Sequence, residues 1–121
     1  MDGGKDSLII LPWPSIDLSP NSRIHWAKKA KAVKVYRKIA CWETIVSKQK
    51  VTWDEFIYLV VTFHPPDNRI RDMDNLAASM KSANDGIADA LRVDDSQFRI
   101  KNKMGEVVKG GRVTVEISQY E

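Results

Sequence analysis

Two aspartates separated by one residue lie in a short polar stretch near the middle of the chain, and a third follows further on. Asp72 and Asp74 flank Met73, and Asp95 belongs to the run Val93-Asp94-Asp95-Ser96. In an extended backbone, side chains two positions apart point to the same side, so we expect the first two carboxylates to converge. Paired carboxylates repel each other unless a cation lies between them, and Mg²⁺ prefers hard oxygen ligands. The pattern therefore predicts a divalent-metal site.

The segment after this pair can complete the site. Asp95 comes just after a predicted helix, and it returns a third carboxylate to the same place if that helix packs back along the sheet. Lys81 lies seven residues after Asp74, close to two helical turns, so its ammonium can lie over the same site and counter the charge of a phosphorane. Three carboxylates with one or two Mg²⁺ ions can activate water and neutralise a phosphate. The pattern favours a phosphodiester hydrolase.

The same acids also have a purely structural interpretation. An aspartate at the start of a helix is a common N-cap and complements the helix dipole. The pair Asp94-Asp95 before Ser96 is equally typical of an ordinary turn. Short acidic motifs are weak evidence when taken singly. Spacing alone therefore predicts an acidic metal site, with helix capping as its alternative.

Positive charge is concentrated in one segment of the chain. The net charge is only +3, but residues 25–50 hold eight lysines and arginines against a single acid, Glu43. Such basic residues can contact a DNA backbone and position a duplex without reading its sequence. The candidates for these contacts are Lys31, Lys34 and Lys38, which share one face of a predicted helix, and Arg69 and Arg71 beside the acids. A solvated helix face and loop is the alternative for each of them.

Hydrophobic periodicity predicts the elements that must position these residues. Strands are expected over residues 8–11, 56–63, 97–104 and 112–118, and helices over residues 23–47 and from Asp74 or Asn75, as N-cap, to about residue 91. Gly86 weakens the second helix locally. The expected core face of the first helix comprises Ala32, Val35, Tyr36, Ile39, Trp42 and Val46.

The turn at Lys109-Gly110-Gly111 can pair the last two strands as an antiparallel hairpin, with Val113, Val115 and Ile117 on its buried face. The element order is then β-α-β-α-β-β. It predicts an α+β fold in which one domain, residues 1–121, has a mixed β-sheet covered by two helices.

Composition indicates the cellular compartment in which the protein works. Cys41 is the only cysteine, which excludes an intrachain disulfide framework and favours a reducing compartment. The first apolar run, residues 8–11, ends at Pro12 and is too short for a signal sequence or a membrane span. We expect a cytoplasmic protein with no membrane partner.

Motifs spread over nearly the whole chain carry a family resemblance. They are Leu11-Pro12-Trp13-Pro14, His25-Trp26 before a lysine-rich helix, Phe63-His64-Pro65-Pro66-Asp67, Arg71-Asp72-Met73-Asp74-Asn75-Leu76, Asp85-Gly86-Ile87-Ala88-Asp89-Ala90-Leu91, Asp94-Asp95-Ser96-Gln97 and Lys109-Gly110-Gly111-Arg112. In this combination they resemble the RusA family of Holliday junction resolvases, which is common in phages and prophages. The block Asp-x-Asp-Asn-Leu followed at this distance by Asp-Asp-Ser-Gln is the most specific part.

The resemblance implies a homodimeric, Mg²⁺-dependent endonuclease of DNA recombination and repair, in which Mn²⁺ can substitute and no organic cofactor is needed. Such an enzyme nicks two opposed strands of a four-way junction and leaves ligatable ends. Asp72, Asp74 and Asp95 match the family's three essential acids. In the best-known member the essential lysine follows the second acid by about one helical turn, whereas Lys81 follows by about two, on a similar face. Its role is either kept by this shifted lysine or absent.

A dimer also has a physical reason, because a nearly two-fold junction is most simply cut twice by an isologous dimer with two sites. Two other functions fit the same residues. One is an endonuclease that acts on other branched DNA intermediates of phage replication or packaging. The other is a non-catalytic module that binds branched DNA, in which the acids only cap helices.

Overall fold

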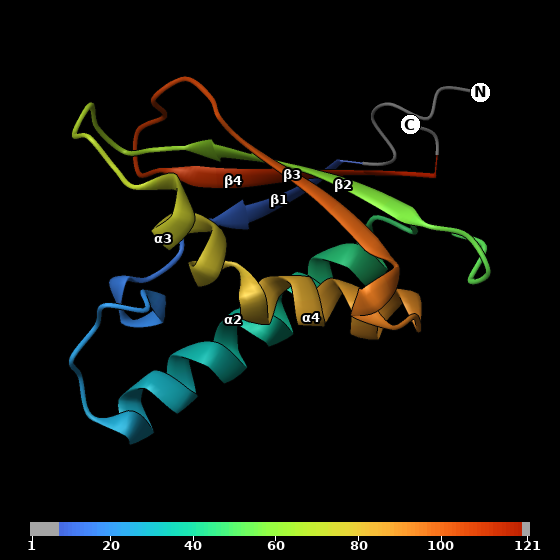
Figure 1. Cartoon of the computed structure of the whole chain (residues 1–121), viewed down its shortest axis with the longest axis horizontal. Coiled ribbons are helices and arrows are strands. Elements are labelled where there is room, and N and C mark those ends of the chain that lie inside the picture. The colour runs from blue at the N-terminus through green and yellow to red at the C-terminus, as the bar shows by residue number, and fades with distance from the viewer. Residues whose placement is uncertain (1–7, 120–121) are drawn as a thin grey trace.

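Four strands form one mixed sheet in the computed structural model, which describes residues 8–119. The strands are β1 (Leu8–Pro12), β2 (Ile57–His64), β3 (Phe98–Met104) and β4 (Arg112–Ser118), in the spatial order β1-β4-β2-β3. Buried and half-buried residues alternate along β2, as expected for a strand with one face on the core. Figure 1 shows the helices beneath this sheet. The prediction of an α+β domain with a mixed sheet is confirmed.

The last two strands do not pair with each other, so the predicted hairpin is wrong. β3 lies parallel to β2, whereas β4 lies antiparallel between β1 and β2. After β3 the chain crosses the end of β2, where the Gly105 N–H donates to Phe63 O at 2.8 Å and the Val108 N–H to Pro65 O at 3.0 Å. This crossing lets β4 bury Val113, Val115 and Ile117 between two neighbouring strands, and their predicted burial is confirmed.

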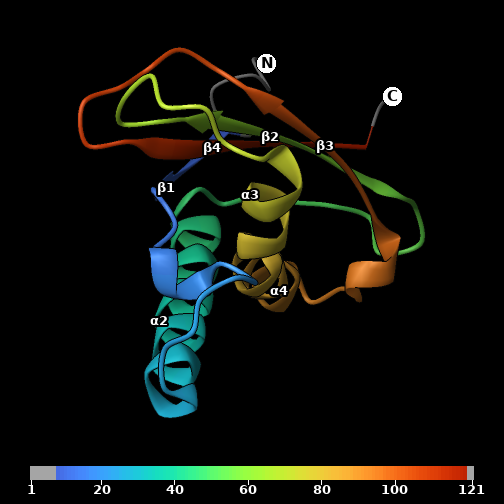
Figure 2. The same ribbon diagram turned by 60° about the vertical axis from the view of Figure 1, so that its left-hand side comes forward.

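Three α-helices cover one face of the sheet, rather than the two expected. They are α2 (Trp26–Val46), α3 (Met73–Ser79) and α4 (Lys81–Leu91), and two 3₁₀ turns, η1 (Ile16–Leu18) and η2 (Asp95–Gln97), precede α2 and β3. Figure 2 shows all three helices on the same side of the sheet. None of the helices within residues 8–119 combines the length and apolar composition needed to cross a membrane.

The predicted second helix is divided at Met80. The Met80 N–H donates to Ala77 O at 3.1 Å, a tighter turn than the α-helical pattern, so α3 ends and α4 begins there. The Met80 side chain is fully buried, and its sulfur lies 3.7 Å from the hydroxyl oxygen of Tyr36. The bend thus follows from tertiary packing, and no proline or glycine marks it in the sequence.

α4 is packed closely against α2. A Cβ atom on Gly86 would lie 2.2 Å from the carbonyl oxygen of Arg37, so only glycine lets the two backbones approach this closely. The Arg37 guanidinium also binds the Asp89 carboxylate in a bidentate pair, with distances of 2.7 and 2.9 Å. These contacts hold the middle and the C-terminal half of α4 against α2.

The exposed side of α2 is wider than expected. Tyr36 is buried, and Ala32 and Ile39 are partly buried against the core, as predicted. The prediction is wrong for the remaining three members of the core face, Val35, Trp42 and Val46, which are 48%, 63% and 53% exposed. Because α2 is the outer helix of the layer, only a narrow stripe of its surface meets other elements. Lys31, Lys34 and Lys38 are exposed, as expected.

Candidate functional site

Asp72 and Asp74 lie at the exposed start of α3. Asp72 is the N-cap, and its Oδ1 accepts a hydrogen bond from the Asp74 N–H at 2.9 Å. The extended backbone assumed for this pair and the N-cap assignment to Asp74 or Asn75 are therefore both wrong, because the helix begins earlier and Asp74 is in its first turn. The two carboxylates still lie close in the chain, at a helix end whose free N–H groups favour negative charge.

Lys81 links the start of α4 to Asp95. Its ammonium nitrogen lies 3.1 Å from Asp95 Oδ2 and 2.8 Å from Asp85 Oδ1. The hydrogen bonds that Lys81 donates to these carboxylates, first to Asp85 and then to Asp95, raise the pKa of Lys81. The structure thus brings together two of the predicted site residues and adds Asp85, which the sequence reasoning missed. Its spacing of four residues from Lys81 was the available signal.

The donor set suits Mg²⁺ in its chemistry but is not gathered into a closed cage. Within residues 8–119, no three aspartate, glutamate, histidine or cysteine side chains converge closely enough to hold a metal ion. Mg²⁺ is commonly held by one or two carboxylates, with water and substrate phosphates as the other ligands. The exposed pair Asp72 and Asp74 matches this open type of site. Asp95, in the arrangement found, binds Lys81 instead.

The loop before Asp72 is organised around Asp67. Its carboxylate accepts from the Arg69 backbone N–H at 3.0 Å, from the Arg69 side chain and from Arg71, and these bonds, the backbone one foremost, lower the pKa of Asp67 to about 2. Arg71 also donates to two carbonyl oxygens of the loop and lies over the Trp13 ring, 5.5 Å from its centre. Its side chain is only 14% exposed, against 79% for Arg69. Arg71 therefore holds the loop, and Arg69 is the accessible cation.

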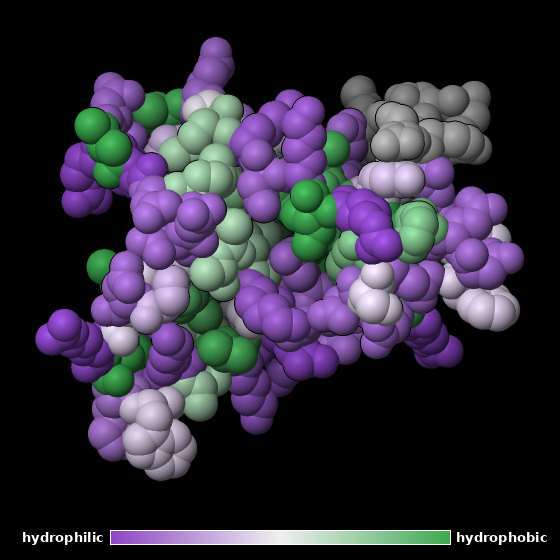
Figure 3. Space-filling model, in the orientation of Figure 1, coloured by the Kyte–Doolittle hydropathy of each residue, from purple (hydrophilic) through white to green (hydrophobic). Residues whose placement is uncertain are grey.

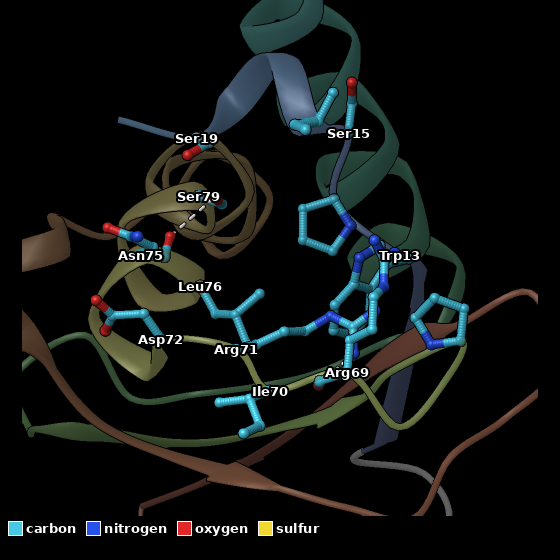
Figure 4. Close-up of a pocket in the computed structure, with 13 residues that line it drawn as sticks. Trp13, Ser15, Ser19, Arg69, Ile70, Arg71, Asp72, Asn75, Leu76 and Ser79 are labelled. Carbon is cyan, nitrogen blue, oxygen red and sulfur yellow. Dashed lines mark hydrogen bonds between the residues drawn. The ribbon is translucent and has the colours of Figure 1, made fainter. Parts of the chain in front are cut away.

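A cavity of about 430 Å³ adjoins Asp72. In Figure 4, Asp72 lies on one side of it and Trp13 on the other. Ile70 lies at its edge and is fully exposed. Trp13 and Ser15 also line a second groove that includes Lys31 of α2. The segment around Trp13 thus connects the surroundings of the acid pair with the basic face of α2.

Three lysines of α2 have no counter-ion within residues 8–119, whereas a fourth, Lys28, lies 4.0 Å from Asp17. Among residues 8–119, Lys31, Lys34 and Lys38 form no ion pair, whereas Arg37 is taken up by Asp89. Unpaired exposed ammonium groups are available to an anionic partner and add to the local positive potential. The lysines share one helical face, as the spacing predicted, and their contact with DNA stays a prediction.

Comparison with known proteins gives one informative result. No protein-family model matches the chain. The chain is 38% identical over 119 residues to a protein of Xylella fastidiosa, strain Temecula1, that is described as an uncharacterized protein. The match covers 91% of this chain and 74% of that protein. The similarity therefore spans most of the chain and is not confined to one motif.

Proposed function

The chain belongs to the same family as this Xylella fastidiosa protein, and we propose that it is a RusA-like, Mg²⁺-dependent endonuclease that cuts four-way DNA junctions. The observation that carries the proposal is the pair Asp72 and Asp74 at the exposed start of α3, where Asp72 lines the same cavity as the accessible Arg69. Two carboxylates next to a cation suit a divalent ion and the phosphate that it binds. The ion pair between Lys81 and Asp95 supports including the third acid in the same site.

The proposal gives each residue a chemical role. Asp72 and Asp74, with Asp95 as third ligand, hold the ion, for which Mn²⁺ can substitute. The bound ion supplies charge neutralisation at the phosphate and an activated water. Lys81 places a positive charge beside Asp95 and stabilises the negative charge that builds up on the phosphate during cleavage.

DNA contacts and symmetry complete the proposal. Arg69 and the α2 lysines, Lys31, Lys34 and Lys38, bind phosphates of the junction arms, and Arg71 acts through the loop that it holds. Two copies of the chain form an isologous dimer, so that two opposed strands of one junction are nicked symmetrically.

Replacing Lys81 by methionine tests the role of its ammonium. We expect Lys81→Met to slow single-turnover cleavage on the order of 10²-fold, because one stabilising charge at the phosphate is lost. Lys81→Arg keeps the charge and should recover part of the rate. Lys48→Met, at an exposed position after α2, is the matched control and should cut at the parent rate. A Lys81→Met rate equal to that of this control would remove Lys81 from the mechanism.

The substrate is tested with three DNAs of identical arm sequence: a four-way junction, a three-way fork and a linear duplex. In Mg²⁺ we expect paired, symmetric nicks in the four-way junction and slow cleavage of the other two. Equal rates on the fork and the four-way junction would instead support an endonuclease for branched DNA in general. Equal rates on all three would remove the selectivity for branched DNA.

A second function, a non-catalytic module that binds branched DNA, is favoured by one observation. Within residues 8–119, Asp72 caps α3, Asp95 binds Lys81, and the three acids do not form a closed group of ligands. This function predicts that the chain binds the four-way junction but leaves it intact in Mg²⁺ and in Mn²⁺. The same cleavage assay therefore separates the two functions.

A further inference from the structure

The sheet face turned away from the helices carries a row of cations. On β2 the residues Ile57, Leu59, Val61 and Phe63 are fully buried, so Tyr58, Val60 and Thr62 lie on the opposite, outer face. Their register partners on β3 are Arg99, Lys101 and Lys103, in that order. These three cations, called here the β3 row, therefore share the outer face.

The outer face has a surplus of positive charge. Its four strands, within the described residues, contribute one acid, Glu116, against the β3 row and Arg112. Arg99 is tethered, because its guanidinium donates to Ser96 O and Phe98 O and lies over the Phe56 ring. Lys101 and Lys103 are exposed and form no ion pair with any residue from 8 to 119. In Figure 3, hydrophilic side chains cover much of the surface over β3.

The row begins close to Asp95, the third candidate acid. β3 follows directly from η2, so Arg99 comes four residues after Asp95. Alternate residues of a strand are about 6.6 to 6.8 Å apart, a distance comparable to that between successive phosphates of one DNA strand. A row of cations with this spacing can therefore follow a DNA backbone, with one phosphate beside each side chain.

We propose that the β3 row binds the phosphate backbone of a DNA arm, as a second contact surface besides α2. The inference rests on the proposed function in that DNA is the ligand, but it requires binding only and no cleavage. The side chains next to Lys103 on the outer face are polar, as expected for a surface that binds a charged ligand. Lys103 is in register with Thr62, which pairs with Thr114 on β4. The tethered Arg99 gives the row a fixed end near Asp95.

Edge-strand lysines also have a simpler role. β3 is an edge strand of the sheet, and charged side chains there prevent pairing with the edge of another molecule. That role alone predicts that loss of the lysines changes solubility and leaves DNA binding unaltered. The salt dependence of DNA binding therefore distinguishes the two explanations.

The test compares two double variants of the full chain, Lys101→Gln/Lys103→Gln and, as matched control, Lys48→Gln/Lys50→Gln. Both remove two exposed ammonium groups and lower the net charge equally. Binding to a four-way junction is measured without divalent metal at several KCl concentrations, with the fold checked by circular dichroism. We expect the slope of log K against log[KCl] to become shallower by about 1.8 in the β3 variant, since each phosphate contact accounts for about 0.9, and to stay unchanged in the control.

Equal slopes for the parent, the β3 variant and the control would overturn the inference. So would an equal change in both variants, since the effect would then come from net charge. Cleavage by the parent in Mg²⁺ is measured in parallel. A shallower slope confined to the β3 variant, together with a parent that does not cut, supports the inference while the endonuclease proposal fails. Unchanged slopes with a parent that cuts remove the β3 row alone.

Discussion

Asp74→Asn is expected to slow Mg²⁺-dependent cleavage of a four-way junction on the order of 10³-fold. The substitution keeps the shape of the side chain but removes the charge that a divalent ion requires from one of its two adjacent ligands. Asp74 makes no side-chain capping bond, since the cap of α3 is Asp72, so the helix should form as before. Single-turnover rates at saturating enzyme report this loss without interference from product release.

DNA affinity and a control variant show whether the loss of cleavage in Asp74→Asn comes from the loss of a metal ligand. The affinity of Asp74→Asn for the junction, measured by anisotropy without metal, should equal or exceed that of the parent, because one repulsive charge near the phosphates is gone. Asp54→Asn changes an exposed acid in the loop before β2 and should cut at the parent rate. If Asp74→Asn cuts as fast as Asp54→Asn, Asp74 is not a metal ligand.

Gly86→Ala is expected to lower the free energy of unfolding by about 3 kcal/mol or more. The added Cβ would lie 2.2 Å from the carbonyl oxygen of Arg37 and 3.0 Å from two further backbone atoms of α2. Backbone atoms cannot turn aside as a flexible side chain can, so α4 must move away from α2. This cost exceeds the gain of about 1 kcal/mol that alanine brings to a helix interior.

Urea denaturation followed by circular dichroism measures the effect of Gly86→Ala. Ala78→Gly, at an exposed position of α3, is the control for helix propensity and should cost about 1 kcal/mol. A Gly86→Ala protein as stable as the parent would contradict the close approach of α2 and α4.

The parts of the fold that depend on local periodicity were predictable. The alternation of Val113, Val115 and Ile117 identified the buried face of β4, and the spacing of lysines identified the exposed face of α2. Strand order was not predictable. The alternation of apolar and polar residues shows which face of a strand is buried, but it does not show which strands pair with it. The glycine turn before β4 was real, with positive φ at Gly110 and Gly111, yet it joins strands that are not neighbours.

The candidate site also has features that were predictable from the sequence and features that were not. The sequence identified the acidic and basic residues, and the structure brings two of them, Lys81 and Asp95, into an ion pair. The bend at Met80 depends on the contact between Met80 and Tyr36, and the order of the loop at Asp67 depends on Arg69 and Arg71. Neither feature could be predicted from the hydrophobic periodicity of the sequence. The convergence of all three acids on one ion stays a prediction.

Crystals of the protein with junction DNA and Mn²⁺ would test the central claim most directly. An anomalous difference map locates Mn²⁺ independently of any assumption about its ligands. We predict a peak within coordination distance of Asp72 and Asp74 and of a DNA phosphate, with Asp95 turned from Lys81 toward the ion. A peak bound elsewhere, or DNA seated on the protein with no ion at these acids, would contradict the account.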